Sequence, residues 1–450
     1  MRCTGSQRLA IVLAAVVALA LGAVPGARAD VRADLAASAP APAGTSVDRA
    51  KLLDAVIETI ERRFADPELL KKLDWVGRAK AARSSVLSAP TLDDAVARIN
   101  DLIAELKTSH TGLYTPDDYR YYITLDILNG AATTRDLIFE RFWGTGPHFP
   151  GIGIFAAGAD GRHFVDGVLE GSPADQAGLK YGDEILSIDG QPFSPIAAFR
   201  GKLGASVEVT LRRAPDAEPV RVVVPVIPII PSVAFADAAR ASTRVIEKNG
   251  RRIGYVHVWS INESRSLRAA LTALQGANQG TAKQLDALII DIRGRVGGNT
   301  GTAAQMLDMI GSRPAPYWGG LQLVDLAGNR NSSEAFMGAA RIPQRPLFEG
   351  RTALLIDHQT RSAGEVLTYG YKRARFGTVF GTTTAGAVAS GAPFAMPGGL
   401  MLYVAQSGLE FDGKRLDGIG VEPDHRVERP LPYAQGADPV LDAALEFLAQ

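Results

Sequence analysis

Residues 358–377 read HQTRSAGEVLTYGYKRARFG, and Ser362 opens the helix-forming part of this stretch. The run TALLIDH before it predicts a strand, so we expect Ser362 at a strand-to-helix turn. Glu365 follows three residues later, which is the spacing of a capping box, where the two side chains satisfy amides of the helix start. The turn would also hold a nucleophilic serine rigidly in the field of the helix N-terminus. This stretch alone leaves both roles open.

The sequence around this stretch alternates strands and helices. Upstream of it, RIGYVHV and LDALIIDI predict strands, and SRSLRAALTALQGA and GTAAQMLDMIG predict helices. Alternation of this kind favours an α/β layer architecture with a parallel component, which we assign to residues 232–450. Pro- and Gly-rich sequence at 313–350 interrupts the pattern, and LMLYVAQSGLEF predicts a strand followed by a turn.

The first residues have the pattern of a secretory signal. Arg2 and Arg8 flank a basic start, LAIVLAAVVALALGAV is an apolar core, and GARA offers small residues before a cleavage point after Ala29. The alternative is an uncleaved membrane anchor, but the apolar run is short for a span. Cys3 is the only cysteine, so a mature exported chain would have no disulfide and no thiol nucleophile.

Length and composition predict several domains without a nucleic-acid partner. The chain has 450 residues, with 48 basic and 48 acidic side chains and 46% hydrophobic residues, as in a globular protein. Residues 30–46 are Ala/Pro/Ser-rich and read as a flexible leader. Helical periodicity predicts a small helical domain over 47–115, and 116–149 is a connecting segment without a clean period.

Residues 151–193 read GIGIFAAGADGRHFVDGVLEGSPADQAGLKYGDEILSIDGQPF. This run resembles a PDZ domain of bacterial exported proteases, and we place the module at 150–231. The resemblance implies that the loop Gly151, Ile152, Gly153 and Ile154 faces a bound carboxylate and that the strand after it pairs with a peptide. The alternative is a small β domain without a ligand.

A PDZ module between a helical domain and an α/β domain resembles the C-terminal processing peptidases, or tail-specific proteases. The resemblance implies a multidomain α/β fold with a crotonase-like or ClpP-like layered core, and it implies Ser362 as nucleophile. LIIDIRGRVGGNTG, residues 288–301, is similar to the family's Gly-Gly motif. The amide of Gly297 or Gly298 would then form the oxyanion hole with that of Ala363. The alternative is a Gly-rich turn; the Lys-Ser/Thr of a phosphate loop is missing.

The chain departs from this family where many members carry the lysine base. The segment here is GTTTAGAVASG, and Ala387 stands at the lysine position. Lys372 lies about 15 Å along the same predicted helix as Ser362, and Lys414 lies in a predicted turn, so neither is a good substitute. A serine hydroxyl still needs a base. His110, in LIAELKTSHTGLYTPDD, resembles the Ser-His segment of the tricorn-like branch, which uses Ser, His and an acid.

Two histidines and two acids complete the alternatives. His358 is the main rival as base, and His257 is expected to be structural. The tricorn-like pattern has an acid a few residues before a Gly-Val-x-Pro-Asp signature, and KRLDGIGVEPDH places Asp417 there, with Glu422 as the alternate. Ser109 corresponds to a serine that supports the acid in that branch.

The sequence therefore predicts an exported, periplasmic or secreted serine endopeptidase. It would bind protein substrates with apolar C-termini through the PDZ domain and cleave with Ser362, His110 and Asp417. We expect no cofactor and no metal site, since no H-E-x-x-H motif is present. We also expect no membrane span in the mature chain, since no later segment is long and apolar enough to cross a bilayer. The alternative is a catalytically inactive PDZ-containing binding protein of the same fold, with which Ala387 is equally compatible.

Overall fold

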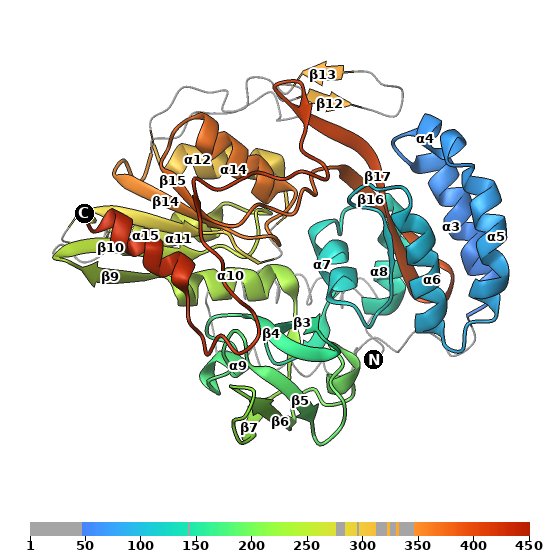
Figure 1. Ribbon diagram of the computed structural model, residues 1–450, viewed down its shortest axis with the longest axis horizontal. Helices are drawn as coiled ribbons and strands as arrows, with labels where there is room; N and C mark the ends of the chain where they lie inside the picture. The colour runs from blue at the N-terminus through green and yellow to red at the C-terminus, as the bar shows by residue number, and fades with distance from the viewer. Residues whose placement is uncertain are drawn as a thin grey trace, which may run out of the picture.

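The structure is a computed structural model that describes residues 47–142, 145–275, 284–294, 297–311, 322–324, 330–332 and 346–450. The predicted signal sequence and leader, residues 1–46, lie outside the described residues, as does most of the insertion at 313–350. The order of elements along the described chain is helical, then β-rich, then α/β (Figure 1).

Four helices form the N-terminal region, as the periodicity predicts. They are α3 (Arg49–Arg63), α4 (Pro67–Lys72), α5 (Trp75–Leu87) and α6 (Leu92–Ala104). Helix α6 begins with a reciprocal capping box formed by Thr91 and Asp94. The buried faces of the helices pack against the distant strands β16 (Ser390–Met396) and β17 (Leu400–Phe411), so they share one core with the C-terminal half.

The connecting segment is held together by aromatic side chains. It contains β1 (Gly112–Tyr114), α7 (Tyr119–Ile127), η1 (Ala132–Thr134), α8 (Arg135–Phe142) and β2 (Phe149–Gly151). Tyr121, Tyr122 and Phe142 are buried in a cluster that also takes in residues of the PDZ region and the α/β region. Packing of bulky rings from several elements explains why the sequence gives no clean period here.

The predicted PDZ region is a five-stranded antiparallel sheet of order β3-β4-β5-β6-β7. Its elements are β3 (Ile154–Ala159), β4 (Arg162–Val168), α9 (Pro173–Gln176), β5 (Glu184–Ile188), η2 (Ala197–Phe199), β6 (Ser206–Arg212) and β7 (Val220–Pro225). Strand β8 (Ile227–Ile229) pairs with β2. The run SPADQAGL, residues 172–179, contains the short helix α9.

The α/β region is a six-stranded sheet of order β19-β15-β14-β11-β10-β9, with every pair parallel except β9 with β10. Its strands are β9 (Arg244–Lys248), β10 (Arg251–His257), β11 (Ala287–Asp291), β14 (Arg351–Ile356), β15 (Thr378–Gly381) and β19 (His425–Arg426). Its helices are α10 (Pro231–Ser242), α11 (Arg265–Leu274), α12 (Thr300–Met309), α14 (Ala363–Arg373) and α15 (Pro439–Leu448).

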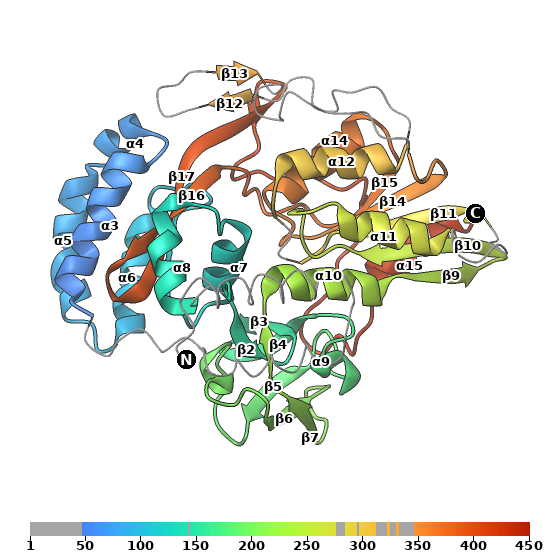
Figure 2. The same cartoon turned by 180° about the vertical axis from the view of Figure 1, so that it is seen from behind.

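Alternate residues of the central strands face opposite helix layers. Leu288 and Ile290 of β11 pack with α11, α12 and α14, whereas Ala287 and Ile289 pack with α15. Both views place α10 between this sheet and the PDZ region (Figures 1 and 2). The predicted α/β layers with a parallel component are confirmed.

A second sheet joins strand β1, which follows the N-terminal helices, to strands from the last third of the chain. Strand β17 pairs with β1, β16, β12 (Gln322–Val324) and β18 (Lys414–Arg415), and β12 also pairs with β13 (Arg330–Ser332). A short 3-10 turn, η3 (Pro397–Gly399), separates β16 from β17. The prediction of a turn within LMLYVAQSGLEF is wrong, because β17 continues through all twelve residues and gains partners on both edges.

Candidate active site

Ser362 lies in the turn that joins β14 to α14. Its backbone has φ 52° and ψ −122°, a strained conformation for a residue with a side chain. The Ser362 amide donates to Glu365 Oε2 at 3.2 Å, so the carboxylate half of the capping box is formed. The amide of Glu365 donates to the backbone carbonyl of Ser362 at 2.9 Å, and the hydroxyl makes no cap hydrogen bond within the described part of the chain. The serine thus caps the helix through its backbone carbonyl, and its hydroxyl lies at the helix start.

The turn before Ser362 is hydrogen-bonded to Ile292 and Gly294, which follow strand β11. Thr360 Oγ1 donates to the Ile292 carbonyl at 2.9 Å, and the Gly294 amide donates to Asp357 Oδ2 at 3.0 Å. Asp357 also accepts from the amide of Thr360 at 2.9 Å. These bonds fix the serine turn against the carboxyl end of β11, where the glycine pair follows.

The two glycines of the motif differ in what they do. A Cβ built on Gly297 would lie 3.5 Å from the Cβ of Ser362, so Gly297 faces the serine directly. Gly298 has φ 146°, and a Cβ there would lie 2.4 Å from the backbone carbon of Ile261, so only glycine fits. Ala363 begins α14, and its amide has no hydrogen-bond partner among the described residues. A free helix-start amide and a glycine beside the serine are what an oxyanion hole requires.

Residues 387–389 connect the serine to the N-terminal part of the site. The Ser362 amide also donates to the Ala387 carbonyl at 2.8 Å. Two residues on, the Ala389 amide donates to Asp417 Oδ1 at 3.2 Å and to Ser109 Oγ at 3.3 Å. Two residues of extended chain span about 7 Å, so this short stretch brings Ser109 and Asp417 close to the serine turn.

Ser109 lies between His110 and Asp417. Its Oγ is 3.0 Å from Nδ1 of His110 and is hydrogen-bonded to Asp417 Oδ1. The Ser109 amide donates to Asp417 Oδ2 at 3.1 Å, and Thr108 Oγ1 donates to the same oxygen at 3.3 Å. Because the carboxylate can only accept, the Ser109 hydroxyl donates to Asp417 and is left to accept from His110 Nδ1–H. That arrangement fixes the tautomer in which Nε2 carries the free lone pair.

His110 has a backbone and an environment that hold its ring in place. Its φ is 56°, and the ring packs against Tyr403 of β17 with 5.5 Å between centroids. Burial lowers the pKa of His110 to about 4, with the positive charge of Arg361 acting in the same direction and Asp417 opposing it. The imidazole is therefore neutral at physiological pH, which is the form that accepts a proton. The electrostatic effect of Arg361, the residue before Ser362, also places the ring near the serine turn.

Glu365 does more than cap a helix. Its buried carboxylate accepts from Thr384 Oγ1 at 2.6 Å and from the amides of Gly386 and Ala387 at 2.8 and 2.7 Å. Burial raises the pKa of Glu365, and these hydrogen bonds oppose that effect. The contacts hold the 384–387 loop beside Ser362, so Glu365 positions the stretch that carries the link to Ser109.

The structure thus brings together Ser362, Gly297 and Ala363 on one side of residues 387–389, and Ser109, His110 and Asp417 on the other. It gives no hydrogen bond between His110 and Ser362, and none directly between His110 and Asp417, over the described chain. Serine–histidine bonds are often long before substrate binds. The predicted peptide-binding loop, Gly151, Ile152, Gly153 and Ile154, lies in the PDZ region at the start of β3.

The alternates lie elsewhere or are engaged. His358 is exposed in the turn after β14. Lys372 forms an ion pair with Asp424 at 3.0 Å and donates to the carbonyl of Glu422, whose own side chain is exposed. His257 is buried and contacts Glu170 at 2.7 Å, as expected of a structural histidine.

Sequence reasoning missed the bridging roles of Ala387, Ala389 and Thr384. They act through backbone groups or through a small hydroxyl, and such contacts leave little trace in residue type. Glu365 gave a signal, because its spacing from Ser362 was noted, but that spacing suggested only a cap. Among the described residues, no group of three or more His, Cys, Asp or Glu side chains is placed to hold a metal ion.

Comparison with known proteins agrees with the fold. Residues 252–427 match peptidase family S41, and residues 164–213 match the PDZ domain. The first range contains Ser362, the glycine pair and Asp417. These matches support a serine peptidase with a PDZ domain.

Individual relatives include both kinds of protease named above. The chain is 25% identical over 413 residues to tricorn protease homolog 2 of Streptomyces coelicolor, covering 86% of this chain but 31% of that protein. It is 25% identical over 419 residues to the carboxyl-terminal-processing protease of a Picosynechococcus species, covering 90% of each. Because both match at the same identity, the choice of base rests on the geometry of the site.

A solved structure shares the fold. The mature form of CPAF complexed with lactacystin superposes with a TM-score of 0.54 at 12% sequence identity, covering 89% of this chain and 98% of that one. The likeness spans the helical, PDZ and α/β regions together, so their arrangement in one chain has a counterpart of known structure.

Proposed function

We propose that this chain is a serine endopeptidase that binds protein substrates with apolar C-termini through its PDZ domain and cleaves them by Ser-His-acid acyl transfer. The observation that carries the proposal is the stretch 387–389. One end of it accepts a hydrogen bond from the Ser362 amide, and the other end donates to Ser109 and Asp417. A nucleophile and a histidine held by an acid through a serine therefore meet within a few residues, although they are distant in the sequence.

Each group has a role in the proposed reaction. Ser362 Oγ attacks the scissile carbonyl while His110 Nε2 takes the hydroxyl proton, and the same imidazole then protonates the leaving amine. The amides of Gly297 and Ala363 donate to the oxyanion of the tetrahedral intermediate. Asp417 stabilises the imidazolium through Ser109. Water deprotonated by His110 then attacks the acyl-enzyme and releases the acid product.

The site needs no lysine base in this proposal. In a Ser-Lys dyad the lysine at position 387 would supply the base, whereas here Ala387 contacts the serine turn through its backbone alone. His110 takes over that role from the other side of the same stretch. Because its pKa is low, the His110 imidazole is neutral and can accept the proton of the Ser362 hydroxyl.

The proposal is tested by cleavage of an unfolded protein with an apolar C-terminus. We expect Ser362→Ala and His110→Ala each to lower kcat/KM by at least about a thousandfold, as for members of a catalytic triad. His358→Ala is the matched control, because this histidine is close to Ser362 in sequence but exposed, and it should keep its activity. Loss of activity in His358→Ala with retention in His110→Ala would move the base to His358. Tight binding without cleavage by the unaltered chain would indicate a binding protein instead.

Export belongs to the same proposal. The basic start, apolar core and small residues before Asp30 support a signal sequence that is cleaved after Ala29, with delivery to the periplasm or medium. Within the part of the chain that the structure describes, no helix is long and apolar enough to cross a membrane. N-terminal sequencing of the exported protein should begin at Asp30.

The predicted domain limits at 115, 149 and 231 also remain part of this proposal.

A further inference from the structure

The groove that a PDZ ligand would enter is already filled by the chain's own side chains. It lies between the Gly151–Phe155 stretch and a wall formed by Pro195 and Phe199. The free space left in it is about 10 Å³, which holds at most one water. An apolar side chain at the end of a peptide therefore cannot enter this groove unless a lining residue moves.

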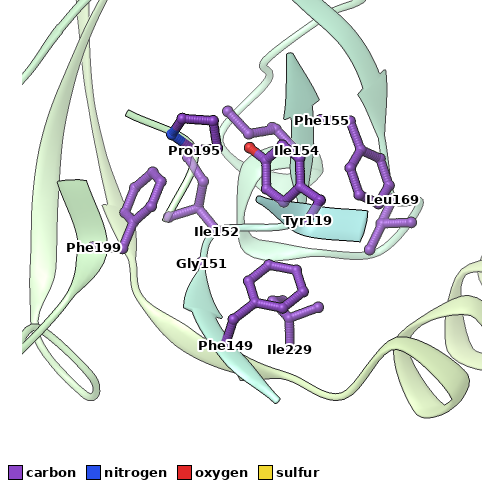
Figure 3. A pocket seen from close by; sticks show the side chains of 11 residues that line it. Tyr119, Phe149, Gly151, Ile152, Ile154, Phe155, Leu169, Pro195, Phe199 and Ile229 are labelled. Atoms are coloured by element: carbon purple, nitrogen blue, oxygen red, sulfur yellow. The ribbon is translucent and has the colours of Figure 1, made fainter. Parts of the chain in front are cut away.

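One residue of the lining, Tyr119, lies on helix α7, which is outside the PDZ region. It is 6% exposed, and its ring packs edge-on against Phe155, with 5.2 Å between centroids. The ring is tilted against that of Phe149, with 5.7 Å between centroids. Figure 3 shows the ring among Ile154, Phe155 and Leu169. Tyr119 thus occupies the apolar part of the groove in the way that a ligand side chain would.

The strand beside the groove offers one unpaired backbone edge, although its first residues, Ile154 and Phe155, are buried. Strand β3 is at the end of its sheet and pairs only with β4 within the described residues. An extended peptide could add to this edge through backbone hydrogen bonds while its last side chain enters the groove. Gly153 helps form the groove, because its φ is 92° and a Cβ there would lie 2.3 Å from that of Ser172. The backbone is therefore ready for a ligand, while Tyr119 occupies the side-chain pocket.

Contacts at both ends of α7 hold Tyr119 in the groove. Before the helix, Asp117 forms an ion pair at 2.6 Å with Arg200, which directly follows the short wall turn η2. At the far end, the buried carboxylate of Asp126 accepts from the Ser232 amide of α10 at 2.6 Å. The half-exposed ion pair is the weaker of these anchors, since solvent screens it.

Other contacts tie the PDZ region to the α/β region independently of α7. Glu170 accepts from Trp259 Nε1 at 2.7 Å and pairs with His257 at 2.7 Å. On another side, the Tyr433 amide donates to the Gly182 carbonyl at 2.9 Å. Because the PDZ region is anchored on both sides, the groove opens most readily by movement of Tyr119 and the start of α7.

We infer that Tyr119 is an internal occupant of the PDZ groove and that a protein C-terminus with an apolar last residue binds by displacing it. The inference rests on the proposed function for the class of ligand, and it concerns how that ligand gains access. Displacing a buried ring costs free energy, so the unaltered chain binds such C-termini weakly and selects those whose last residue can refill the space.

The test measures peptide binding without cleavage. All variants carry Ser362→Ala, and the probe is a fluorescein-labelled ten-residue peptide with apolar residues at its last three positions and a free carboxylate, followed by fluorescence anisotropy. We expect Tyr119→Ala to bind it at least tenfold more tightly. Tyr119→Phe keeps the ring and is the matched control, with no gain. Arg200→Ala, which releases the ion pair at the surface, should give a smaller gain of about two- to fivefold.

Each outcome decides the inference. Equal or weaker binding by folded Tyr119→Ala overturns it, and so does a failure of every variant to bind. If circular dichroism shows that Tyr119→Ala does not fold, Arg200→Ala decides, and unchanged affinity there overturns the inference. Hydrolysis by the chain with Ser362 intact is measured separately. A catalytically inactive chain with a gain in Tyr119→Ala contradicts the proposed peptidase but not the occupied groove.

Discussion

Cleavage should persist into acidic solution, because the environment of His110 keeps its imidazole neutral there. An ordinary histidine titrates near pH 6.5. The pKa of His110 is lowered to about 4, chiefly by burial; Asp417 opposes this effect and Arg361 adds to it. Since kcat/KM reports the pKa of the base in the free enzyme, its acid limb should fall near pH 4.

The size of the effect follows from these two values. At pH 5.5, a base with a pKa of about 4 is roughly 97% neutral, whereas one with a pKa of about 6.5 is roughly 9% neutral. At that pH, kcat/KM should therefore stay above about nine-tenths of its plateau, where an exposed histidine would leave about a tenth. Two variants test the cause. Arg361→Gln removes a positive charge and should move the limb to higher pH, and Asp417→Asn removes a negative charge and should move it to lower pH.

The assay is hydrolysis of an internally quenched peptide between pH 4 and 9 at constant ionic strength. The position of the limb is the readout, because both variants also lower the plateau. Folding must be followed at each pH. Below about pH 6.5 the unfolded chain binds a proton at His110 that the folded chain binds only below about pH 4, so stability falls between those values. Half-maximal kcat/KM near pH 6.5, or a limb that neither variant moves, would refute the reasoning.

Three further predictions follow from contacts around the site. Ser109→Ala should lower kcat by about 10- to 150-fold with KM nearly unchanged, because a charge-assisted hydrogen bond is worth about 1.5–3 kcal/mol; a fall below about threefold would contradict the relay. Burial alone would lower the pKa of His257, but neighbouring carboxylates, Glu170 first, raise it to about 9. This stabilisation is complete below about pH 6.5 and is lost as the pH rises through about 9, so Glu170→Gln should lower Tm at pH 6 and have little effect at pH 10. In urea unfolding, Gly298→Ala should lower stability by more than about 1 kcal/mol, while Gly130→Ala, with open space around it, should change it little.

The parts of the fold that sequence could predict depend on local signals. Apolar periodicity marked the N-terminal helices, including α3 and α6, and strand-helix alternation marked the α/β sheet. The turn at Ser362 was predictable for the same reason, since an apolar strand precedes it and a capped helix follows it. Each of these features is set by residues within a few positions of one another.

The parts that sequence could not predict depend on contacts between distant segments. The sequence marked Ser109 and Asp417 as candidates, but not that the Ser109 hydroxyl stands between the acid and His110. Nothing in an alanine indicates that the carbonyl of Ala387 accepts from the Ser362 amide. The aromatic segment with Tyr119 gave no period, because its rings pack toward three regions at once.

In the proposed mechanism the base comes from His110, so the N-terminal region would have a role in catalysis. His110 lies two residues before β1, which pairs with β17 in the register Gly112 to Tyr403. The histidine ring packs on Tyr403 itself. Strand β17 also carries the core that the N-terminal helices bury, through Leu402 and Val404. A lysine at position 387 would need none of this, because it would lie on the same loop as the serine contact. With Ala387 there, the distance between base and nucleophile depends on the packing of helices on β17. If His110 is the base, as proposed, the helical region positions a catalytic group and is more than a cover for the site.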